Sequence, residues 1–331
     1  MQKITRDILI EKASELLSNG TVSCVLGWRK GEFGYDQTPS VFKSVDEMKE
    51  SFVFDDFSGA NFSKYLVART QKLEGKILVF LKPCDTYSFN QLLTEHRFDR
   101  EKVYAVGIPC EGMVDVSKVK AISGEGITSV SVDGDNILVN TLYSANPVTV
   151  DKNSVLQERC VNCKSKKHVA YDELIGEDGD VISSSRFDEV ERLEKMTADE
   201  RFAFWQNELS RCIRCNACRD ACPACTCEKC VFDNPNSGVE NKAPNSFEEK
   251  FFHIIRAFHV AGRCTDCGEC SRVCPQNIPL HLLNRKFIKD INEFYGEYQA
   301  GAEVGSRAPL VNYTTEDIEP GEVFDRRDEN A

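Results

Sequence analysis

Cysteines at fixed spacing are the residues of this sequence that most directly indicate chemistry. The chain has sixteen cysteines, and seven of them lie within the nineteen residues CIRCNACRDACPACTCEKC, 212–230. Two segments repeat the spacing C-x2-C-x2-C-x3-C-P, which is typical of 4Fe–4S binding. The cysteines of these repeats are Cys212, Cys215, Cys218 and Cys222, followed by Pro223, and Cys264, Cys267, Cys270 and Cys274, followed by Pro275.

The spacing also predicts how these eight thiols divide between two clusters. In ferredoxins with two such motifs, the first three cysteines of a motif bind one cluster and the fourth binds the other. The expected sets are Cys212, Cys215, Cys218 and Cys274 for one cluster, and Cys264, Cys267, Cys270 and Cys222 for the second. Zinc is the alternative, because C-x2-C pairs also form zinc sites. Zinc needs only four ligands, commonly from two separated pairs, so two complete repeats of the longer spacing favour iron.

A third set of cysteines lies nearer the amino terminus. Cys84 follows a predicted strand within KPCD, and Cys110 follows the next predicted strand within GIPCEG. Parallel neighbouring strands would bring both thiols to one edge of a sheet, where Cys160 and Cys163 of RCVNC could join them. We therefore expect a further 4Fe–4S cluster on these four thiolates, because loops at strand ends usually carry binding sites. The alternative is two buried structural cysteines and an unrelated pair.

Four cysteines remain outside these sets. Cys225, Cys227 and Cys230 directly follow the first repeat, and they are either a zinc or cluster site completed by a ligand from elsewhere or spare thiols. Cys24 lies in a predicted strand and is expected to be a buried, inert thiol.

Charged residues near the motifs suggest how the clusters are tuned. His253 and His259 are six residues apart on one predicted helix, so packing or surface roles are favoured over ligation. Basic residues crowd the motifs: Arg211, Arg214, Arg219, Arg263, Arg272 and the segment KSKKH after Cys163. Cations beside a cluster favour its reduced form and raise its potential. Charge at helix ends is the alternative reason for these cations.

The segments around the cysteines predict two kinds of structure, an α/β part followed by a helical part. Segments 76–81 and 103–108 are continuous apolar runs, which suit strands covered on both faces, and segment 86–97 between them has helical periodicity. This unit predicts a parallel pair of strands, and segment 129–141 predicts a β-hairpin. Four predicted helices surround the two repeats, at 186–196, 197–211, 246–262 and 278–296. They favour a helical ferredoxin domain over one built from short strands.

We therefore expect an α/β first domain with a small mixed or parallel sheet, followed by a mainly α-helical ferredoxin domain that binds two 4Fe–4S clusters. The expected ranges are 1–185 for the first domain, 186–299 for the second, and 300–331 for an acidic, extended tail.

Composition narrows the class of protein. The net charge of −12 argues against a general nucleic-acid binder, which needs a basic face. The longest clean apolar run is ILVFL, far shorter than the roughly 20 residues of a membrane span, and the amino terminus does not read as a secretory signal. We therefore expect a cytoplasmic protein. Thiols are kept reduced in the cytoplasm, so the cysteines indicate metal binding rather than disulfides.

Known families share these motifs. On KPCD, GIPCEG and RCVNCKSKKHVAYDELIGEDGD, residues 15–185 resemble the β subunit of coenzyme F420-reducing hydrogenases and dehydrogenases. On CIRCNACRDACPACTC and RCTDCGECSRVCP, residues 200–290 are similar to the dicluster ferredoxin half of sulfhydrogenase β and anaerobic sulfite reductase A subunits. The resemblance implies an iron–sulfur subunit of an anaerobic oxidoreductase, and it also implies FAD. The sequence contains no G-x-G-x-x-G phosphate loop.

These observations predict an electron-transfer subunit of a multisubunit oxidoreductase, of the hydrogenase, formate dehydrogenase or heterodisulfide-reductase-linked type. Its expected partners are other redox subunits, including one with a flavin or a metal centre. No catalytic residue can be assigned from the sequence. The alternatives are a flavoprotein that itself reduces F420, NAD(P) or a similar carrier, and a non-redox zinc scaffold.

Overall fold

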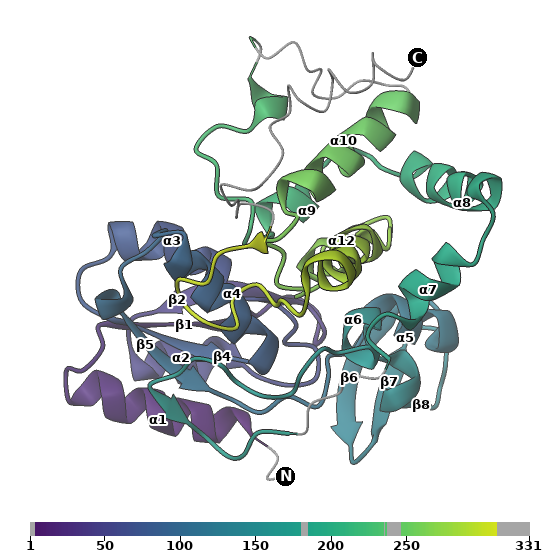
Figure 1. The fold of residues 1–331 in the computed structure, drawn as a ribbon. Helices are drawn as coiled ribbons and strands as arrows, with labels where there is room; N and C mark the ends of the chain where they lie inside the picture. The colour runs from purple at the N-terminus through teal and green to yellow at the C-terminus, as the bar shows by residue number, and fades with distance from the viewer. Residues whose placement is uncertain (1–3, 180–184, 235, 237–245, 310–331) are drawn as a thin grey trace, which may run out of the picture.

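The computed structural model describes residues 4–179, 185–234, 236 and 246–309, with only the backbone at 246–249. The part of the predicted acidic tail that follows residue 309 lies outside the described residues. In Figure 1 an α/β part and a small second sheet lie beneath a group of helices that follows them in the chain.

A mixed sheet between two layers of helices forms the first part of the chain (Figure 1). Its strand order is β2-β1-β4-β5-β9, and β3 also pairs with β1. The strands are β1 Cys24–Lys30, β2 Gln37–Phe42, β3 Phe52–Val53, β4 Ile77–Leu81, β5 Val103–Gly107 and β9 Glu173–Leu174. Helices α1 Arg6–Ser18 and α2 Val45–Ser51 cover one face, and α3 Ser63–Lys72 and α4 Pro83–Thr94 cover the other.

The predicted parallel pair is confirmed in β4 and β5, which run from Ile77 opposite Val103 to Leu81 opposite Gly107. Every residue of β4 is buried, as a strand covered on both faces requires. Helix α4 begins at Pro83 rather than at residue 86, because proline suits the first turn of a helix. Cys84 therefore lies in the first turn of α4.

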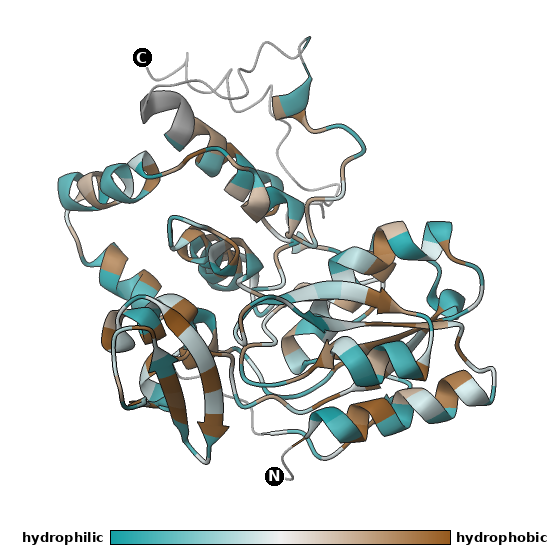
Figure 2. Cartoon of the chain, turned by 180° about the vertical axis from the view of Figure 1, so that it is seen from behind, coloured by the Kyte–Doolittle hydropathy of each residue, from teal (hydrophilic) through white to brown (hydrophobic). Residues whose placement is uncertain are grey.

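A second, three-stranded sheet follows, with its apolar residues drawn brown along the strands in Figure 2. It contains β6 Ile127–Asp133, β7 Asn136–Thr141 and β8 Val148–Asp151, with α5 Val116–Ser123 packed beside β8. The predicted hairpin is β6–β7, and the sequence did not predict β8, which has four residues. Short helical turns follow or join the sheets: η1 Arg100–Lys102, η2 Lys152–Val155 and α6 Glu158–Val161.

The rest of the described chain is helical and confirms the expected fold class. Its elements are α7 Asp188–Glu194, α8 Ala198–Ser210, α9 Ala217–Asp220, η3 Val231–Asp233, α10 Ser246–His259, α11 Glu269–Arg272 and α12 Leu280–Tyr295. The short helices α9 and α11 each contain the third cysteine of a motif. Leu209, Ile278 and Leu280 pack with Cys218 and Cys270, so the motifs form part of the apolar core.

Polar contacts fasten the helical part to the first sheet. The hydroxyl groups of Ser88 on α4 and Thr265 in the second motif share a hydrogen bond of 2.8 Å. Arg263 donates to Glu95 at 2.6 Å, and the backbone N–H of Gly305 donates to Thr94 at 2.9 Å. Residues close to the carboxyl end of the described chain therefore return to α4. Within the described part of the chain, no helix is both long and apolar enough to cross a membrane.

Candidate metal centres

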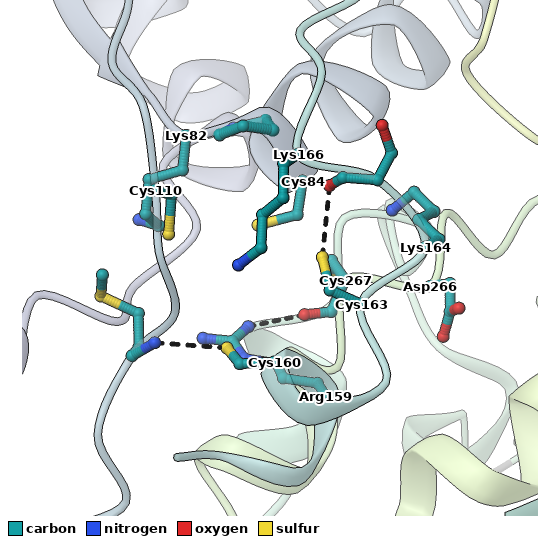
Figure 3. A pocket seen from close by; sticks show the side chains of 13 residues that line it. Lys82, Cys84, Cys110, Arg159, Cys160, Cys163, Lys164, Lys166, Asp266 and Cys267 are labelled. Atoms are coloured by element: carbon teal, nitrogen blue, oxygen red, sulfur yellow. Dashed lines mark hydrogen bonds between the residues drawn. The ribbon is translucent and has the colours of Figure 1, made fainter. Parts of the chain in front are cut away.

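The first-domain cysteines converge on one pocket. Cys84, Cys110, Cys160 and Cys163 all line it, and Figure 3 shows their sulfur atoms around a common space. Cys84 and Cys110 reach it together because β4 and β5 are parallel and end at the same edge. Helix α6 carries Cys160, and the turn that follows it carries Cys163. We call these four thiols the first-domain set.

Backbone groups and cations surround this set. The backbone N–H of Met113 donates to Cys160 Sγ at 3.4 Å, and Cys163 Sγ lies 3.2 Å from the Ser165 carbonyl oxygen. Lys166 points its ammonium group into the space between the thiols (Figure 3). Burial raises the pKa of Cys110 to about 11 and that of Cys84 well above its usual value. Free thiols there are therefore protonated at neutral pH, and metal binding must release protons.

Lys82 is a fully buried cation beside the first-domain set. Its ammonium group pairs with Asp85 at 3.1 Å and donates to the Ala60 carbonyl at 2.8 Å. It also lies 4.7 Å from the centre of the Trp28 ring. A buried charge is tolerated only when paired and hydrogen-bonded, as here. The sequence contained this residue within KPCD, but the motif gave no sign that its charge is buried next to Cys84.

The eight cysteines of the two repeats form two mixed groups. Cys212, Cys215, Cys218 and Cys274 line one pocket, so the fourth cysteine of the second motif lies with the first motif. We call this the outer set, because Cys215 is exposed. Cys264, Cys267 and Cys270 lie close enough to Cys222 for their charges to interact. We call these four the central set.

The backbone explains why both motifs hold thiols in the same way. Arg214 and Asp266, each just before the second cysteine of its motif, have φ of 55° and 56°. Asn216 and Gly268, which precede α9 and α11, have φ of 63° and 65°. Two left-handed residues in each loop turn the chain tightly enough to aim three close cysteines at one point. Asn and Gly are the residues that accept this conformation most readily.

One buried arginine lies between the first-domain set and the central set. Arg159 donates to the Cys267 carbonyl at 2.6 Å and pairs with Glu269 at 2.7 Å. Its charge also acts on Cys84 and Cys160, and Cys267 lines the first-domain pocket. Burial alone would raise the pKa of Glu269, but Arg272 and Arg159 lower it to about 2. The carboxylate is therefore charged, and it compensates the buried arginine.

A second buried arginine lies between the central and outer sets. Arg256 on α10 donates to the Cys218 carbonyl at 2.8 Å, and its charge acts on Cys218, Cys222 and Cys270. Its Nε atom is buried and has no hydrogen-bond partner among the described residues. The sequence gave no sign of this residue, because it lies outside both motifs.

Most of the basic residues that the sequence singled out form ion pairs. Arg211 pairs with Glu208, and Arg219 pairs with Asp233 at 2.6 Å. Arg263 pairs with Glu95, and Arg272 with Glu269 at 2.7 Å. Arg214 instead lies over the Phe252 ring, 4.1 Å from its centre, in the outer pocket. The charges of Arg211, Arg219, Arg263 and Arg272 are thus largely compensated.

His253 contributes more than packing. Its Nε2 lies 3.2 Å from Cys212 Sγ in the outer pocket, whereas His259 is exposed. Burial, with Arg256 and Arg214 nearby, lowers the pKa of His253 to about 3, so the ring is neutral. Its Nδ1 is buried without a hydrogen-bond partner among the described residues.

The remaining cysteines do not form a group of their own. The side chains of Cys225 and Cys222 share a hydrogen bond. This hydrogen bond lowers the pKa of Cys225 to about 7. Cys227 is exposed, Cys230 hydrogen-bonds with Arg219, and Cys24 is buried in β1. No three His, Cys, Asp or Glu side chains in the described part of the chain form a group suited to a single metal ion.

The donor sets fit 4Fe–4S clusters. Each has four thiols, the ligand number of such a cluster, and cluster sulfur atoms accept hydrogen bonds from the protein. The buried, unpartnered Arg256 Nε adjoins the central and outer sets, where such an acceptor would satisfy it.

Comparison with known proteins identifies the class of the helical part first. The family described as "4Fe-4S dicluster domain" matches residues 208–278, which contain all eight cysteines of the two repeats. The chain therefore carries 4Fe–4S clusters, as predicted.

Two relatives match almost the whole chain. The F420-dependent formate dehydrogenase subunit beta of Methanocaldococcus jannaschii is 23% identical, over 90% of this chain and 92% of its own length. The F420-dependent formate dehydrogenase 1 subunit beta of Methanococcus maripaludis is also 23% identical, over 83% of this chain and 87% of its own. A chain of the solved F420-reducing NiFe hydrogenase complex of Methanosarcina barkeri is 16% identical, with a TM-score of 0.36, over 55% of this chain and 69% of that one. The predicted resemblance to F420-linked β subunits is confirmed.

Proposed function

We propose that this protein is an iron–sulfur electron-transfer subunit of a multisubunit oxidoreductase, which relays single electrons through three 4Fe–4S clusters. One observation carries the proposal. The three sets of four thiols follow one another in space, and a buried arginine lies between each neighbouring pair of sets. A cluster on each set would take up and release one electron at a time.

The proposed ligands follow the grouping of the thiols. They are Cys84, Cys110, Cys160 and Cys163 for the first cluster, Cys222, Cys264, Cys267 and Cys270 for the central cluster, and Cys212, Cys215, Cys218 and Cys274 for the outer cluster. Cys222 and Cys274 thereby cross between the motifs. This crossing ties the two motifs into one unit, because neither can complete its cluster alone.

The arginines give the relay its order. Arg159 contacts the central set and acts on the first-domain set, and Arg256 does the same between the central and outer sets. Electrons would therefore pass between the first-domain and outer clusters through the central one. A cation between two clusters favours an electron on either of them.

Exposure at the outer end fits a subunit that works with partners. Cys215 is exposed, so the outer cluster would reach the surface, where a partner can exchange electrons with it. Since the relatives are β subunits of F420-dependent formate dehydrogenases, we propose partner subunits that carry a flavin or a metal centre, in a cytoplasmic complex.

Metal content tests the proposal. Anaerobically reconstituted protein should hold about twelve irons and as many sulfides per chain, from three clusters. Cys84→Ala should remove about four irons and leave both ferredoxin signals in the spectrum of the reduced protein. Cys24→Ala, a buried cysteine outside the sets, is the matched control and should retain all irons. Zinc in place of iron would overturn the proposal.

A second candidate is a flavoprotein that reduces a carrier itself. A cavity of about 240 Å³ adjoins the pocket of the first-domain set, and Cys110 and Met113 line both. Arg6 and Phe54 also line this cavity, so a carrier bound there would lie next to the first cluster. The visible spectrum of the isolated chain with added FAD distinguishes the candidates. Bound flavin together with reduction of F420 or NAD(P) by the chain alone would favour the enzyme.

A further inference from the structure

We propose that Cys225 is a reserve ligand of the central cluster, which binds the iron held by Cys222 when that bond is lost. The inference rests on the proposed function, because it takes Cys222, Cys264, Cys267 and Cys270 as the ligands. In the exchange, the bond from iron to Cys222 Sγ breaks and one to Cys225 Sγ forms. The proton of the Cys225 thiol passes to the Cys222 thiolate, and no electron is transferred.

The turn after the first motif brings Cys225 to the central set. The backbone N–H of Cys225 donates to the Cys222 carbonyl at 3.1 Å, and the two side chains share a hydrogen bond. Cys225 packs against the buried cluster of Cys222, Ala224 and Val260, next to Cys264. Cys225 is therefore a fifth thiol beside the central set, and its side chain contacts Cys222, the ligand that it would replace.

Shared cations suit a thiolate at either position. Arg256 interacts with both Cys222 and Cys225, and its buried Nε has no hydrogen-bond partner among the described residues. Lys64 donates to the Cys225 carbonyl, and its charge acts on both thiols. A negative charge that moves from one sulfur to the other would stay within the same group of cations.

The two neighbouring cysteines do not pack beside Cys222, although the charge of Lys64 also acts on Cys227. Cys227 is exposed, and Cys230 hydrogen-bonds with Arg219. Cys225 is the cysteine of this segment that packs beside Cys222 and Cys264. Cys225, Cys227 and Cys230 therefore have different surroundings, although they lie close together in the sequence.

Iron analysis of four full-length variants tests the inference. Cys222→Ala should keep the iron content of the wild-type chain, with an altered signal from the central cluster. Cys222→Ala with Cys225→Ala should lose about four irons per chain, the content of one cluster. Cys222→Ala with Cys227→Ala is the matched control and should behave as Cys222→Ala does. Cys225→Ala alone should leave iron content and signals unchanged, which shows that this substitution does not disturb folding.

Two results would overturn the inference while the proposed function stands. One is a Cys222→Ala variant that loses as much iron as the double variant, with the wild-type chain fully loaded. The other is a double variant that keeps every iron. A wild-type chain without iron would instead overturn the proposed function, and the inference with it.

Discussion

The two cysteine motifs of the helical part have the same spacing and the same backbone, but their surroundings differ. Arg214 and Asp266 occupy the same left-handed position, with φ of 55° and 56°. The next cysteine is exposed in the first motif, at Cys215, and buried in the second, at Cys267. The first motif reaches the surface at Cys215, whereas the second is enclosed between α6 and α12.

Charge differs between the motifs as well. Arg214 is a cation over the Phe252 ring beside the outer set. Asp266, at the equivalent position, is a buried anion that pairs with Arg186 and Arg285, each at 2.9 Å. Burial would raise the pKa of Asp266, but Arg285 and Arg186 hold it below its usual range. Spacing therefore determines the ligand geometry, and the position in the fold determines the charge around each cluster.

Loss of one ligand from each motif should give the largest effect. Cys215→Ala and Cys267→Ala should each remove about four irons per chain. In Cys267→Ala the outer cluster remains, but it should receive no electrons from the first-domain cluster, because Cys267 belongs to the central set. In Cys215→Ala electrons should still pass from the first-domain cluster to the central one. Rapid-freeze spectra after reduction at one end would measure this. Transfer to the outer cluster that continues in Cys267→Ala would contradict the linear order.

Removal of one buried carboxylate should distinguish the enclosed motif from the exposed one. Glu269→Gln leaves the buried Arg159 without its counter-charge and should cost about 3–5 kcal/mol of unfolding free energy. Glu208→Gln, which breaks the more exposed pair with Arg211, should cost about 0–1 kcal/mol. Chemical denaturation of both variants measures the difference, and equal losses would show that the Arg159 pair is not insulated from water.

Substitution by alanine should have different effects on stability at the two equivalent left-handed positions, Gly268 and Asn216. In Gly268→Ala the added Cβ would lie 2.6 Å from Arg159 Cβ, so overpacking of about 1–3 kcal/mol adds to about 1–2 kcal/mol of backbone strain. Asn216→Ala adds no atom and should cost about 1 kcal/mol. Gly134→Ala, with φ of 60° and open space, is the control for strain alone. Melting temperatures rank the three variants, and a Gly268→Ala loss no larger than that of Gly134→Ala would argue against the close contact.

The smallest expected effect is a change in the reduction potential of one cluster, with no loss of iron. Arg214→Gln removes a cation from the outer pocket and should lower the reduction potential of the outer cluster, because positive charge favours its reduced form. The central cluster should keep its potential. Arg211→Gln, which loses only an outward ion pair with Glu208, is the matched control. A redox titration followed by paramagnetic spectra separates the two clusters, and a shift in the central one would contradict the assignment.

Much of the fold followed from local pattern. The parallel pair β4–β5, the β6–β7 hairpin and the helices around the motifs all appear where periodicity and turn residues placed them. Strand β8 was missed because it is short, and α4 began earlier because its proline opens the helix. The cations beside the thiols were harder to predict. The sequence pointed to arginines near the cysteines in the chain, whereas Arg256 reaches them from α10.

The sequence by itself determined the ligand chemistry, because cluster binding depends on thiols at short, fixed separations along the chain. Both motifs have left-handed residues at the same two positions, in keeping with their identical spacing. Tertiary structure decided which set lies in the middle, which thiol is exposed, and which charges are buried beside each set. Those properties depend on contacts between residues far apart in the chain, such as Arg159 with Glu269 and Arg256 with Cys218. Such contacts form only when the helical part packs against the first sheet and against itself.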